Sequence, residues 1–274
     1  MDPTALLDIA TDAAHQAGAL LLQRFALPAT GVSSKSTPTD PVSDADRDAE
    51  ALVAALIRSR RPADRIVTEE GSGSESGGGA DGGSDPDGGS DPDGGGLTWI
   101  VDPLDGTVNF LFGIPVWSVS IAVEDRDGAL AGVVFDPNRN ESFTATRSGG
   151  AHLNGASIQV SARSDLGSAL IGTGFAYEAK ARSIQAAVVS RVLPLVRDVR
   201  RAGSAALDLA SVACGRLDAF YEAPMEWWDK AAGVLLVREA GGIVTDLPAP
   251  LGLSPGVIAG GPVLHRALTS LVAS

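Results

Sequence analysis

The sequence has little cysteine and histidine and no long apolar run. Its one cysteine, Cys214, lies in an apolar stretch and cannot form a disulfide within the chain, so we expect a buried, inert thiol in the reducing cytoplasm. The three histidines fall in no metal-binding motif, which disfavours zinc. No stretch approaches about eighteen uninterrupted apolar residues. The N-terminus has no basic segment leading into an apolar one, which argues against secretion.

Positive charge is also scarce. The chain has 21 Lys and Arg against 34 Asp and Glu, a formal net charge of −13, which argues against a general nucleic-acid binder. An acidic protein that acts on phosphates needs cations, and divalent metal ions can bridge carboxylates to an anionic substrate. With 274 residues, 44% of them hydrophobic, the chain can form one large domain or two closely packed ones.

Apolar periodicity predicts the first elements of the chain. It indicates a helix over residues 5–25 and a second helix that begins after Ser43, with Asp46 in a capping-box position. Pro62 ends this second helix. A short strand follows over residues 66–68 and leads into Glu69 and Glu70.

Residues 71–96 have a different composition, dominated by Gly, Ser and Asp. A six-residue repeat, Ser-Asp-Pro-Asp-Gly-Gly, begins at Ser84 and again at Ser90. Such a segment cannot bury enough apolar surface to offset its ordering entropy, so we predict a mobile, solvated loop. Calcium-binding repeats also use Gly and Asp, but two short copies without an apolar packing position disfavour that interpretation.

The remainder of the chain predicts an antiparallel sheet followed by α/β layering. The expected strands are residues 97–101, 116–123, 129–135, 217–221 and 242–245. The expected helices are residues 178–193, 205–214 and 228–240.

The densest chemical signal is the segment 99–110, in which a buried strand leads into Asp102 and Asp105. Acids at the end of a buried strand are costly unless something neutralises them. Pro103 interrupts the regular strand and Gly106 allows a ligand to approach the backbone closely. Two carboxylates with a nearby carbonyl suit magnesium, and a helix beginning at Thr107 would present amides to a phosphate. A plain turn capped by Asp102 is the alternative.

Two more acids stand at the ends of predicted elements. Glu69 follows a strand, and Asp229 follows Trp228 at the start of a helix, where a helix cap is the alternative role. Together with Asp102 and Asp105 they make the oxygen-rich set that a two-metal phosphatase requires.

These segments resemble the inositol monophosphatase family, a branch of the lithium-sensitive, magnesium-dependent phosphatases. The matching segments follow the family's order: Glu69-Glu70, residues 102–110, residues 203–206, Trp228-Asp229 and residues 239–242. The stretch Asp-Pro-Leu-Asp-Gly-Thr combined with a distant Trp-Asp is highly specific. The match spans most of the chain. The connection between Glu69 and Asp102 is longer than is usual in the family, but each doubling of a loop costs only about 0.6 kcal/mol.

The resemblance implies an α+β fold, a layered αβαβα sandwich. We expect an N-terminal half over residues 1–145 that carries the metal-binding motifs, and a C-terminal half over residues 146–274 that carries the substrate pocket. The active site would lie between them. Relatives are often dimers, so a homodimer is also implied.

The resemblance further implies two Mg²⁺ ions. Glu69, Asp102 and the carbonyl of Leu104 would bind the first, and Asp102, Asp105 and Asp229 the second. A third, more weakly held ion near Glu69 is also consistent with the family.

Catalytic and substrate-binding roles come from the same resemblance. Asp46 and Thr107 would orient and deprotonate a metal-bound water for in-line attack on phosphorus, without a phosphoenzyme. Lys35 and Asp40 belong to a loop that is similar to the family's mobile loop over the metals; for Lys35 a solvated surface charge is the alternative. The residues expected to contact the substrate are Asp105, Gly106, Thr107, Gly203, Ala205, Glu222 and Asp229.

The implied activity is magnesium-dependent hydrolysis of a small phosphate monoester, with inositol monophosphate first. Histidinol phosphate, 3′-phosphoadenosine 5′-phosphate and fructose 1,6-bisphosphate are the alternatives. Glu222 favours a polyol, although an acid could also bind the amine of histidinol. A regulatory binding protein on the same fold, with partners such as the transcription machinery, is the non-enzymatic alternative; the presence of every catalytic position counts against it.

Overall fold

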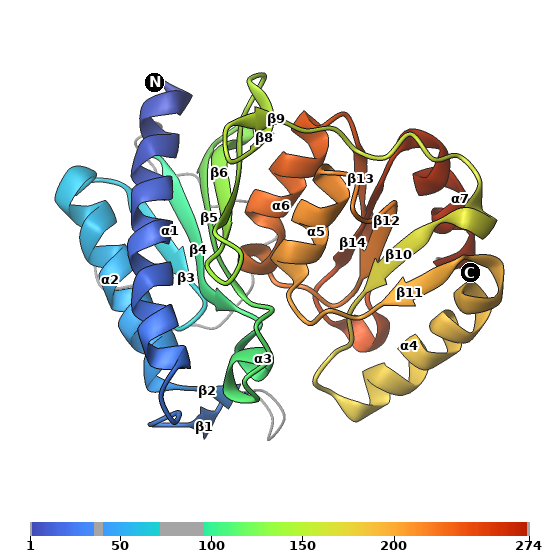
Figure 1. Cartoon of the computed structure of the whole chain (residues 1–274), viewed down its shortest axis with the longest axis horizontal. Coiled ribbons are helices and arrows are strands. Elements are labelled where there is room, and N and C mark those ends of the chain that lie inside the picture. The colour runs from blue at the N-terminus through green and yellow to red at the C-terminus, as the bar shows by residue number, and fades with distance from the viewer. Residues whose placement is uncertain (1, 36–40, 72–95, 273–274) are drawn as a thin grey trace.

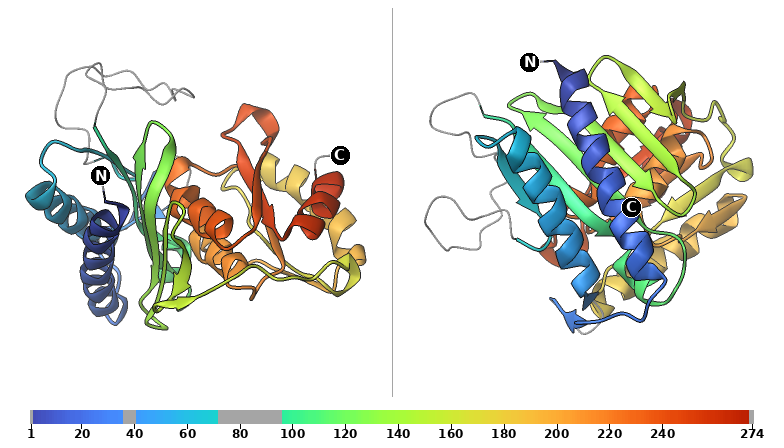
Figure 2. Two further views of the ribbon diagram at one scale, coloured as in Figure 1. Left: turned by 90° about the horizontal axis from the view of Figure 1, so that it is seen from above. Right: turned by 60° about the vertical axis from the view of Figure 1, so that its left-hand side comes forward.

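The computed structural model describes residues 2–35, 41–71 and 96–272. In this part of the chain two sheets and their helices form five layers (Figure 1). Helices α1 and α2 cover the outer face of a seven-stranded sheet, α5 and α6 lie between the two sheets, and α4 and α7 cover the outer face of a five-stranded sheet (Figure 2). This arrangement confirms the predicted αβαβα sandwich.

The seven-stranded sheet has the order β3-β4-β5-β6-β7-β8-β9, with only β3 and β4 parallel. The elements of this half are α1 (Pro3–Phe25), β1 (Ser33–Ser34), β2 (Pro41–Val42), α2 (Asp44–Arg60), β3 (Arg65–Thr68), β4 (Thr98–Asp105), α3 (Thr107–Leu111), β5 (Ser118–Asp125), β6 (Gly128–Asp136), β7 (Glu141–Thr146), β8 (Gly150–Leu153) and β9 (Ala156–Ser157).

The five-stranded sheet has the order β11-β10-β12-β14-β13. Its elements are β10 (Leu170–Thr173), α4 (Ala179–Val192), β11 (Asp198–Arg200), α5 (Ala205–Ala213), β12 (Ala219–Glu222), α6 (Trp227–Glu239), β13 (Ile243–Leu247), β14 (Gly256–Gly260) and α7 (Pro262–Val272). Three 3-10 turns connect them: Leu166–Ser168, Leu193–Leu195 and Pro250–Gly252.

Helix α6 is buried on all sides because it packs between the sheets. Every residue from Lys230 to Val237 is buried, which is typical of a central helix rather than an amphipathic one. Small residues allow the close packing: a Cβ on Gly233 would lie 2.6 Å from Leu209 of α5, and one on Gly132 of β6 would lie 3.2 Å from Ala232. The middle of α6 is therefore packed closely between β6 of one sheet and α5.

Strand β4 continues to Asp105, four residues beyond the predicted end of the strand. Its pairing with β3 ends at the Thr68–Val101 pair, so the missing N–H of Pro103 breaks no bond on that side. On the other side, the register with β5 shifts between Asp102 and Asp105. This irregularity is the effect we predicted for Pro103.

Several other predictions can be compared with the structure. The capping box of Ser43 and Asp46 is present at the start of α2, and α2 ends at Arg60, before Pro62. Cys214 is half-buried rather than buried, and burial raises the pKa of its thiol. In the described part of the chain, no helix is long and apolar enough to cross a bilayer. Asp40 and residues 72–95, which include the repeat, lie outside the described residues.

The division into two halves stays a proposal. We predicted a boundary at residue 145, but strands β8 and β9 extend the seven-stranded sheet to Ser157. The next strand, β10, belongs to the other sheet and begins at Leu170. We therefore propose that the boundary lies between residues 157 and 170.

Candidate active site

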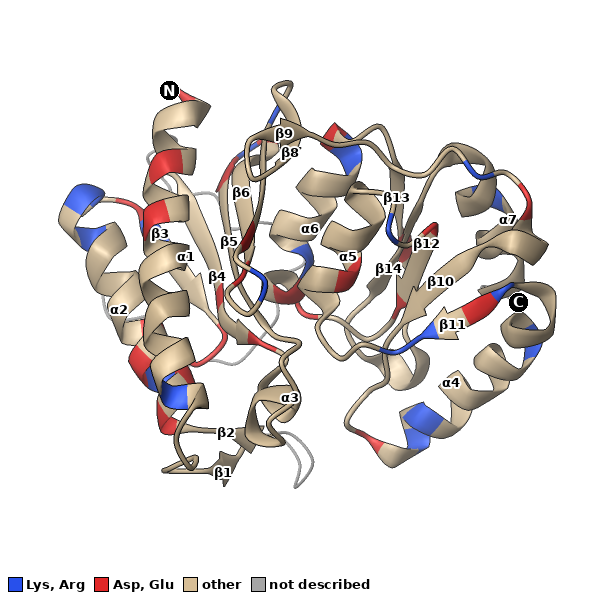
Figure 3. Ribbon diagram, in the orientation of Figure 1, with Lys and Arg blue, Asp and Glu red and all other residues tan. Residues whose placement is uncertain are grey.

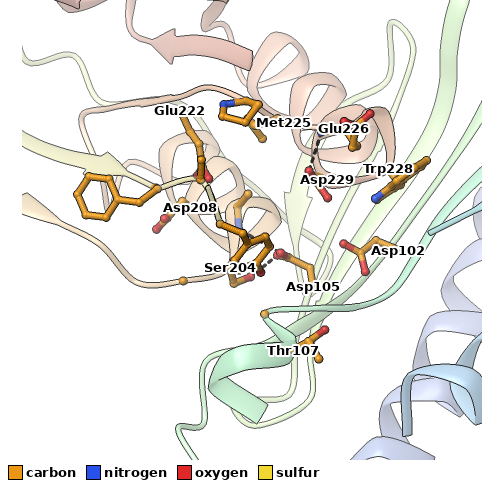
Figure 4. A pocket seen from close by; sticks show the side chains of 18 of the residues that line it. Asp102, Asp105, Thr107, Ser204, Asp208, Glu222, Met225, Glu226, Trp228 and Asp229 are labelled. Carbon is orange, nitrogen blue, oxygen red and sulfur yellow. Dashed lines mark hydrogen bonds between the residues drawn. The ribbon is translucent and has the colours of Figure 1, made fainter. Parts of the chain in front are cut away.

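A cavity of about 630 Å³ lies where the end of β4 meets the first residues of α3, α5 and α6. Acidic positions gather at these element ends (Figure 3). The side chains that surround the cavity are drawn in Figure 4. The predicted site residues that line it are Lys35, Glu69, Asp102, Leu104, Asp105, Gly106, Thr107, Gly203, Ala205, Glu222 and Asp229.

Asp105 connects the end of β4 to the start of α5. Its carboxylate accepts hydrogen bonds from the backbone N–H of Ala206 (2.9 Å) and of Ala205 (3.2 Å), and from the Ser204 hydroxyl. These donors belong to the first turn of α5 and its cap, where backbone amides have no partner within the helix. The end of β4 is thereby fixed to the start of α5.

Asp229 and Asp102 are held by neighbouring backbone. Asp229 accepts from the N–H of Glu226 (2.7 Å) in a capping box at the start of α6, so it both caps the helix and lines the cavity. Asp102 accepts from the N–H of Leu104 (3.0 Å) within the irregular part of β4. Both the cap role and the cavity role considered for Asp229 are therefore present.

Lys35 is a half-buried partner of the acidic residues and not a solvated surface charge. Its ammonium lies 2.8 Å from Oε1 of Glu69 and also pairs with Glu70, and its side chain is 18% exposed. These carboxylates raise the pKa of Lys35 despite its burial. Glu69 therefore has a cationic partner within the chain itself.

The acids repel one another across the cavity. Burial raises the pKa of Asp102 well above its usual value, and the charges of Glu69, Asp105 and Asp229 raise it further. Burial raises the pKa of Asp229 well above its usual value, and the charges of Glu69, Asp105 and Glu222 raise it further. Burial raises the pKa of Glu69 to about 7, although Lys35 opposes the shift. A cation between these groups would relieve the repulsion.

The donor set suits a hard cation such as magnesium, because it consists of carboxylates and one carbonyl. Within residues 2–35, 41–71 and 96–272, however, no three Asp, Glu, His or Cys side chains are close enough to hold one ion as they stand. In this arrangement Glu69 is paired with Lys35, Asp105 with the first turn of α5, and Asp229 with the N–H of Glu226. The residues fit a metal by their chemistry and by their location on one cavity.

Thr107 and Asp46 form a second feature of the site. The Thr107 hydroxyl donates to Oδ1 of Asp46 at 2.8 Å and also lies 3.1 Å from the Leu104 carbonyl. The other carboxylate oxygen, Oδ2, accepts from the N–H and the hydroxyl of Ser43. Asp46 is fully buried behind Thr107, so a group in the cavity reaches Asp46 through the Thr107 hydroxyl.

Two glycines allow the backbone around α3 to pack closely. Gly106 has φ 97°, and a Cβ there would lie 3.0 Å from the Val116 carbonyl and 3.2 Å from that of Gly203. Asn109 donates to the carbonyls of Val116 (2.7 Å) and Ala202 (2.9 Å) and ties the segments together. These contacts bring Gly106 and Gly203 to the same side of the cavity.

Several residues of the cavity wall were not assigned a role from the sequence. Arg201, Ser204 and Asp208 all line the cavity. Arg201 carries no local signal. Ser204 lies in the segment 203–206 that matches the family, but its bond to Asp105 depends on a contact distant in sequence. Asp208 does carry a local sequence signal, because it is the single charged residue of the apolar helix α5. A lone acid in such a stretch indicates either a buried partner or a ligand.

Comparison with known proteins decides the family. The model of the inositol monophosphatase family matches residues 2–274. The chain belongs to this family. It is 43% identical over 283 residues to an inositol-1-monophosphatase of Mycobacterium leprae, covering 97% of this chain and 93% of the relative. It is 40% identical over 266 residues to the Nus factor SuhB of Escherichia coli K12, covering 96% and 94%.

A solved structure of the extragenic suppressor protein suhB from Bartonella henselae has the same fold. It superposes with a TM-score of 0.83 and 36% sequence identity, and the match covers 98% of each chain. The resemblance to inositol monophosphatases and the layered fold are therefore confirmed.

For this inositol monophosphatase family member we predict that the metal-free protein becomes less stable as the pH rises. Burial raises the pKa of Glu69 from 4.5 to about 7 and that of Glu222 from 4.5 to about 8. A carboxyl that holds its proton more tightly in the folded state stabilises the fold while protonated, and this contribution is lost as the pH rises through the folded pKa.

The measurement is the melting temperature at pH 5.5 and pH 8.5, in chelator and in Mg²⁺. In chelator, Tm should fall between the two pH values. Mg²⁺ should raise Tm more at pH 8.5, where the acids are ionised and a cation binds the folded state selectively. A melting temperature that rises with pH in chelator would contradict the prediction.

Proposed function

We propose that the chain is a magnesium-dependent phosphomonoesterase that hydrolyses inositol monophosphate or a similar small polyol phosphate. The observation that carries the proposal is the shared cavity: four acids surround one end, the Thr107–Asp46 pair borders it, and Glu222 lies at the other end. Its volume of about 630 Å³ is within the usual range for small-molecule sites. Family membership supports phosphatase activity.

The proposed ligands of two Mg²⁺ ions follow the predicted sets. Glu69, Asp102 and the Leu104 carbonyl would hold one, and Asp102, Asp105 and Asp229 the other, with a third, weaker ion near Glu69. When bound, such ions polarise the phosphoryl group and lower the pKa of water. Family membership supports magnesium as the metal.

The proposed role of Thr107 follows from its hydrogen bond. Because its hydroxyl donates to Asp46, the oxygen keeps lone pairs that can accept a proton from a water in the cavity. Asp46 can then take the Thr107 proton in the same step, as a general base that acts through one hydroxyl. The amides at Gly106 and Thr107 begin α3 beside this position and are suited to bind phosphate oxygens.

The opposite end of the cavity would receive the alcohol. Glu222 packs so closely on Gly174 that a Cβ there would lie 1.9 Å from its Oε2, and burial raises the Glu222 pKa to about 8. Near neutral pH this carboxyl is largely protonated and can both donate and accept hydrogen bonds. A neutral polyol suits such a group, with Gly203 and Ala205 beside it.

The test is phosphate release from four substrates in parallel with Mg²⁺: inositol 1-phosphate, histidinol phosphate, 3′-phosphoadenosine 5′-phosphate and fructose 1,6-bisphosphate. We expect inositol 1-phosphate to give the highest kcat/KM, by about tenfold or more, a difference of about 1.4 kcal/mol in transition-state binding. A higher value for histidinol phosphate would reassign the substrate. Release from none of them would exclude the phosphatase.

A regulatory binding role is the second candidate, because one relative at 40% identity is named a Nus factor. We expect this chain to release phosphate regardless, since its acids and the Thr107–Asp46 pair are all present.

A homodimer and a cytoplasmic location also stay proposals. Light scattering on the purified protein checks the first, and cell fractionation the second.

A further inference from the structure

We propose that Asp208 determines substrate specificity: with Glu222 it forms a two-acid subsite, here called the acid pair, that binds neighbouring hydroxyls of the substrate alcohol. The proposal rests on the function proposed above. Asp208 lies in the first turn of α5 and is 4% exposed, and Glu222 ends strand β12. Both side chains line the cavity beyond Asp105 and the metal-binding acids (Figure 4).

The acid pair has no hydrogen-bonding partner in the described part of the chain. Neither the Asp208 nor the Glu222 carboxylate accepts a hydrogen bond there. Other buried carboxylates do: Asp136 accepts from Arg139 and two backbone amides, and Asp218 from Ser161, Arg163 and the N–H of Leu170. Asp208 is buried and Glu222 is half-buried; because buried polar groups are nearly always paired, the unpaired Asp208 carboxylate facing the cavity beside Glu222 indicates a ligand.

Glycines of β10 and the residues after it bring the two acids together. Strand β10 pairs with β12 through Gly172 and Phe220, and a Cβ on Gly172 would lie 3.7 Å from Cγ of Asp208. Gly174, just after the strand, gives Glu222 its space. After burial, the Asp208 charge is the largest cause of the raised Glu222 pKa. Both carboxyls therefore lie beside the end of β10 and line the same cavity, where one ligand can reach them.

Charge favours a neutral polyol over an amine. Burial raises the pKa of both Asp208 and Glu222, and Arg201, which lines the same cavity, opposes these shifts without forming an ion pair with either acid in the described chain. The Arg201 guanidinium already supplies a positive charge to the wall of this cavity. The subsite then needs hydrogen-bond donors without added charge, which adjacent hydroxyls provide. An alcohol without them would leave the acids unpaired, and sites of this kind reject such analogues.

The experiment compares kcat/KM for inositol 1-phosphate and cyclohexyl phosphate, the ring without the other hydroxyls. We expect Asp208→Ala to lower the value for inositol 1-phosphate by about 10 to 100-fold more than the value for cyclohexyl phosphate, as for lost hydrogen bonds to a charged group. Asp208→Asn keeps one acceptor oxygen, so its selective loss of kcat/KM for inositol 1-phosphate should be smaller than that of Asp208→Ala but larger than zero. The control is Asp218→Asn, a buried carboxylate outside the cavity, which should leave the ratio of the two substrates unchanged.

Stability supplies an independent measurement. Because Asp208 is buried without a hydrogen bond, Asp208→Asn should melt at the wild-type temperature or above it. In wild type, myo-inositol should raise Tm more than cyclohexanol does, and Asp208→Ala should remove this difference.

Three results would overturn the acid pair as a polyol subsite. If Asp208→Ala lowered kcat/KM equally for inositol 1-phosphate and cyclohexyl phosphate, Asp208 would have only a structural role. A wild-type preference for 4-aminobutyl phosphate that disappears in Asp208→Ala would make the subsite an ammonium site. Absence of any differential stabilisation by myo-inositol would exclude polyol binding. A different result would separate the subsite from the reaction. If the protein hydrolysed no phosphate ester, but myo-inositol still raised the Tm of wild type and not that of Asp208→Ala, the proposed reaction would be refuted and the subsite supported.

Discussion

Asp105→Asn is expected to lower kcat for inositol 1-phosphate by at least about 10², the effect of removing one key electrostatic group from an active site. The substitution keeps the shape of the side chain and removes its charge. It also places an amide where the hydroxyl of Ser204 and the amides of Ala205 and Ala206 now donate. The proposed second Mg²⁺ would lose a ligand. The measurement is steady-state phosphate release with saturating Mg²⁺.

The matched control is Asp136→Asn. Asp136 is equally buried and accepts three hydrogen bonds near the end of β6, but it does not line the cavity. This variant should lose stability and keep its kcat. If Asp105→Asn released phosphate at the wild-type rate, or if Asp136→Asn were equally slow, the assignment of Asp105 would be wrong.

Thr107→Val is expected to lower kcat by about 10², the lower end of the usual contribution from general base catalysis. Valine keeps the branched shape and packing of threonine but lacks the hydroxyl through which a water in the cavity would reach Asp46. KM should change little, because the hydroxyl acts on the attacking water rather than on the substrate. Kinetics at saturating Mg²⁺ measure both constants.

Thr107→Ser serves as the rescue variant, since it restores a hydroxyl at the same position. It should recover kcat to within about tenfold of wild type. The relay would be refuted if the serine variant were as slow as the valine variant. Wild-type kcat in Thr107→Val would refute it as well.

Local patterns predicted a large part of the fold. Helices α1 and α2 were predicted because their apolar spacing, capping residues and the stop at Pro62 agree with one another. Strands β7 to β11 and β14, and helix α7, were not predicted. Short strands such as β14, Gly256–Gly260, are apolar runs that pattern alone does not separate from helix or loop. Its position between β12 and β13 depends on pairing distant in sequence.

The site was predictable where chemistry is concentrated in short motifs. Glu69, Asp102, Asp105 and Asp229 could be selected because acids at the ends of buried elements are unusual, and the structure places all four on one cavity. Their partners could not be predicted. The bonds from Ser204 and the α5 amides to Asp105 span about a hundred residues, and only the packed fold defines them.

The order in which these residues occur along the chain also determines when the site can form. Asp46 is translated before Asp229, which follows it by 183 residues (229 − 46). Strand β14, which lies between β12 and β13, is made later still. A nascent chain on the ribosome therefore lacks the complete pocket until β14 has been made, and catalysis should begin only after that point.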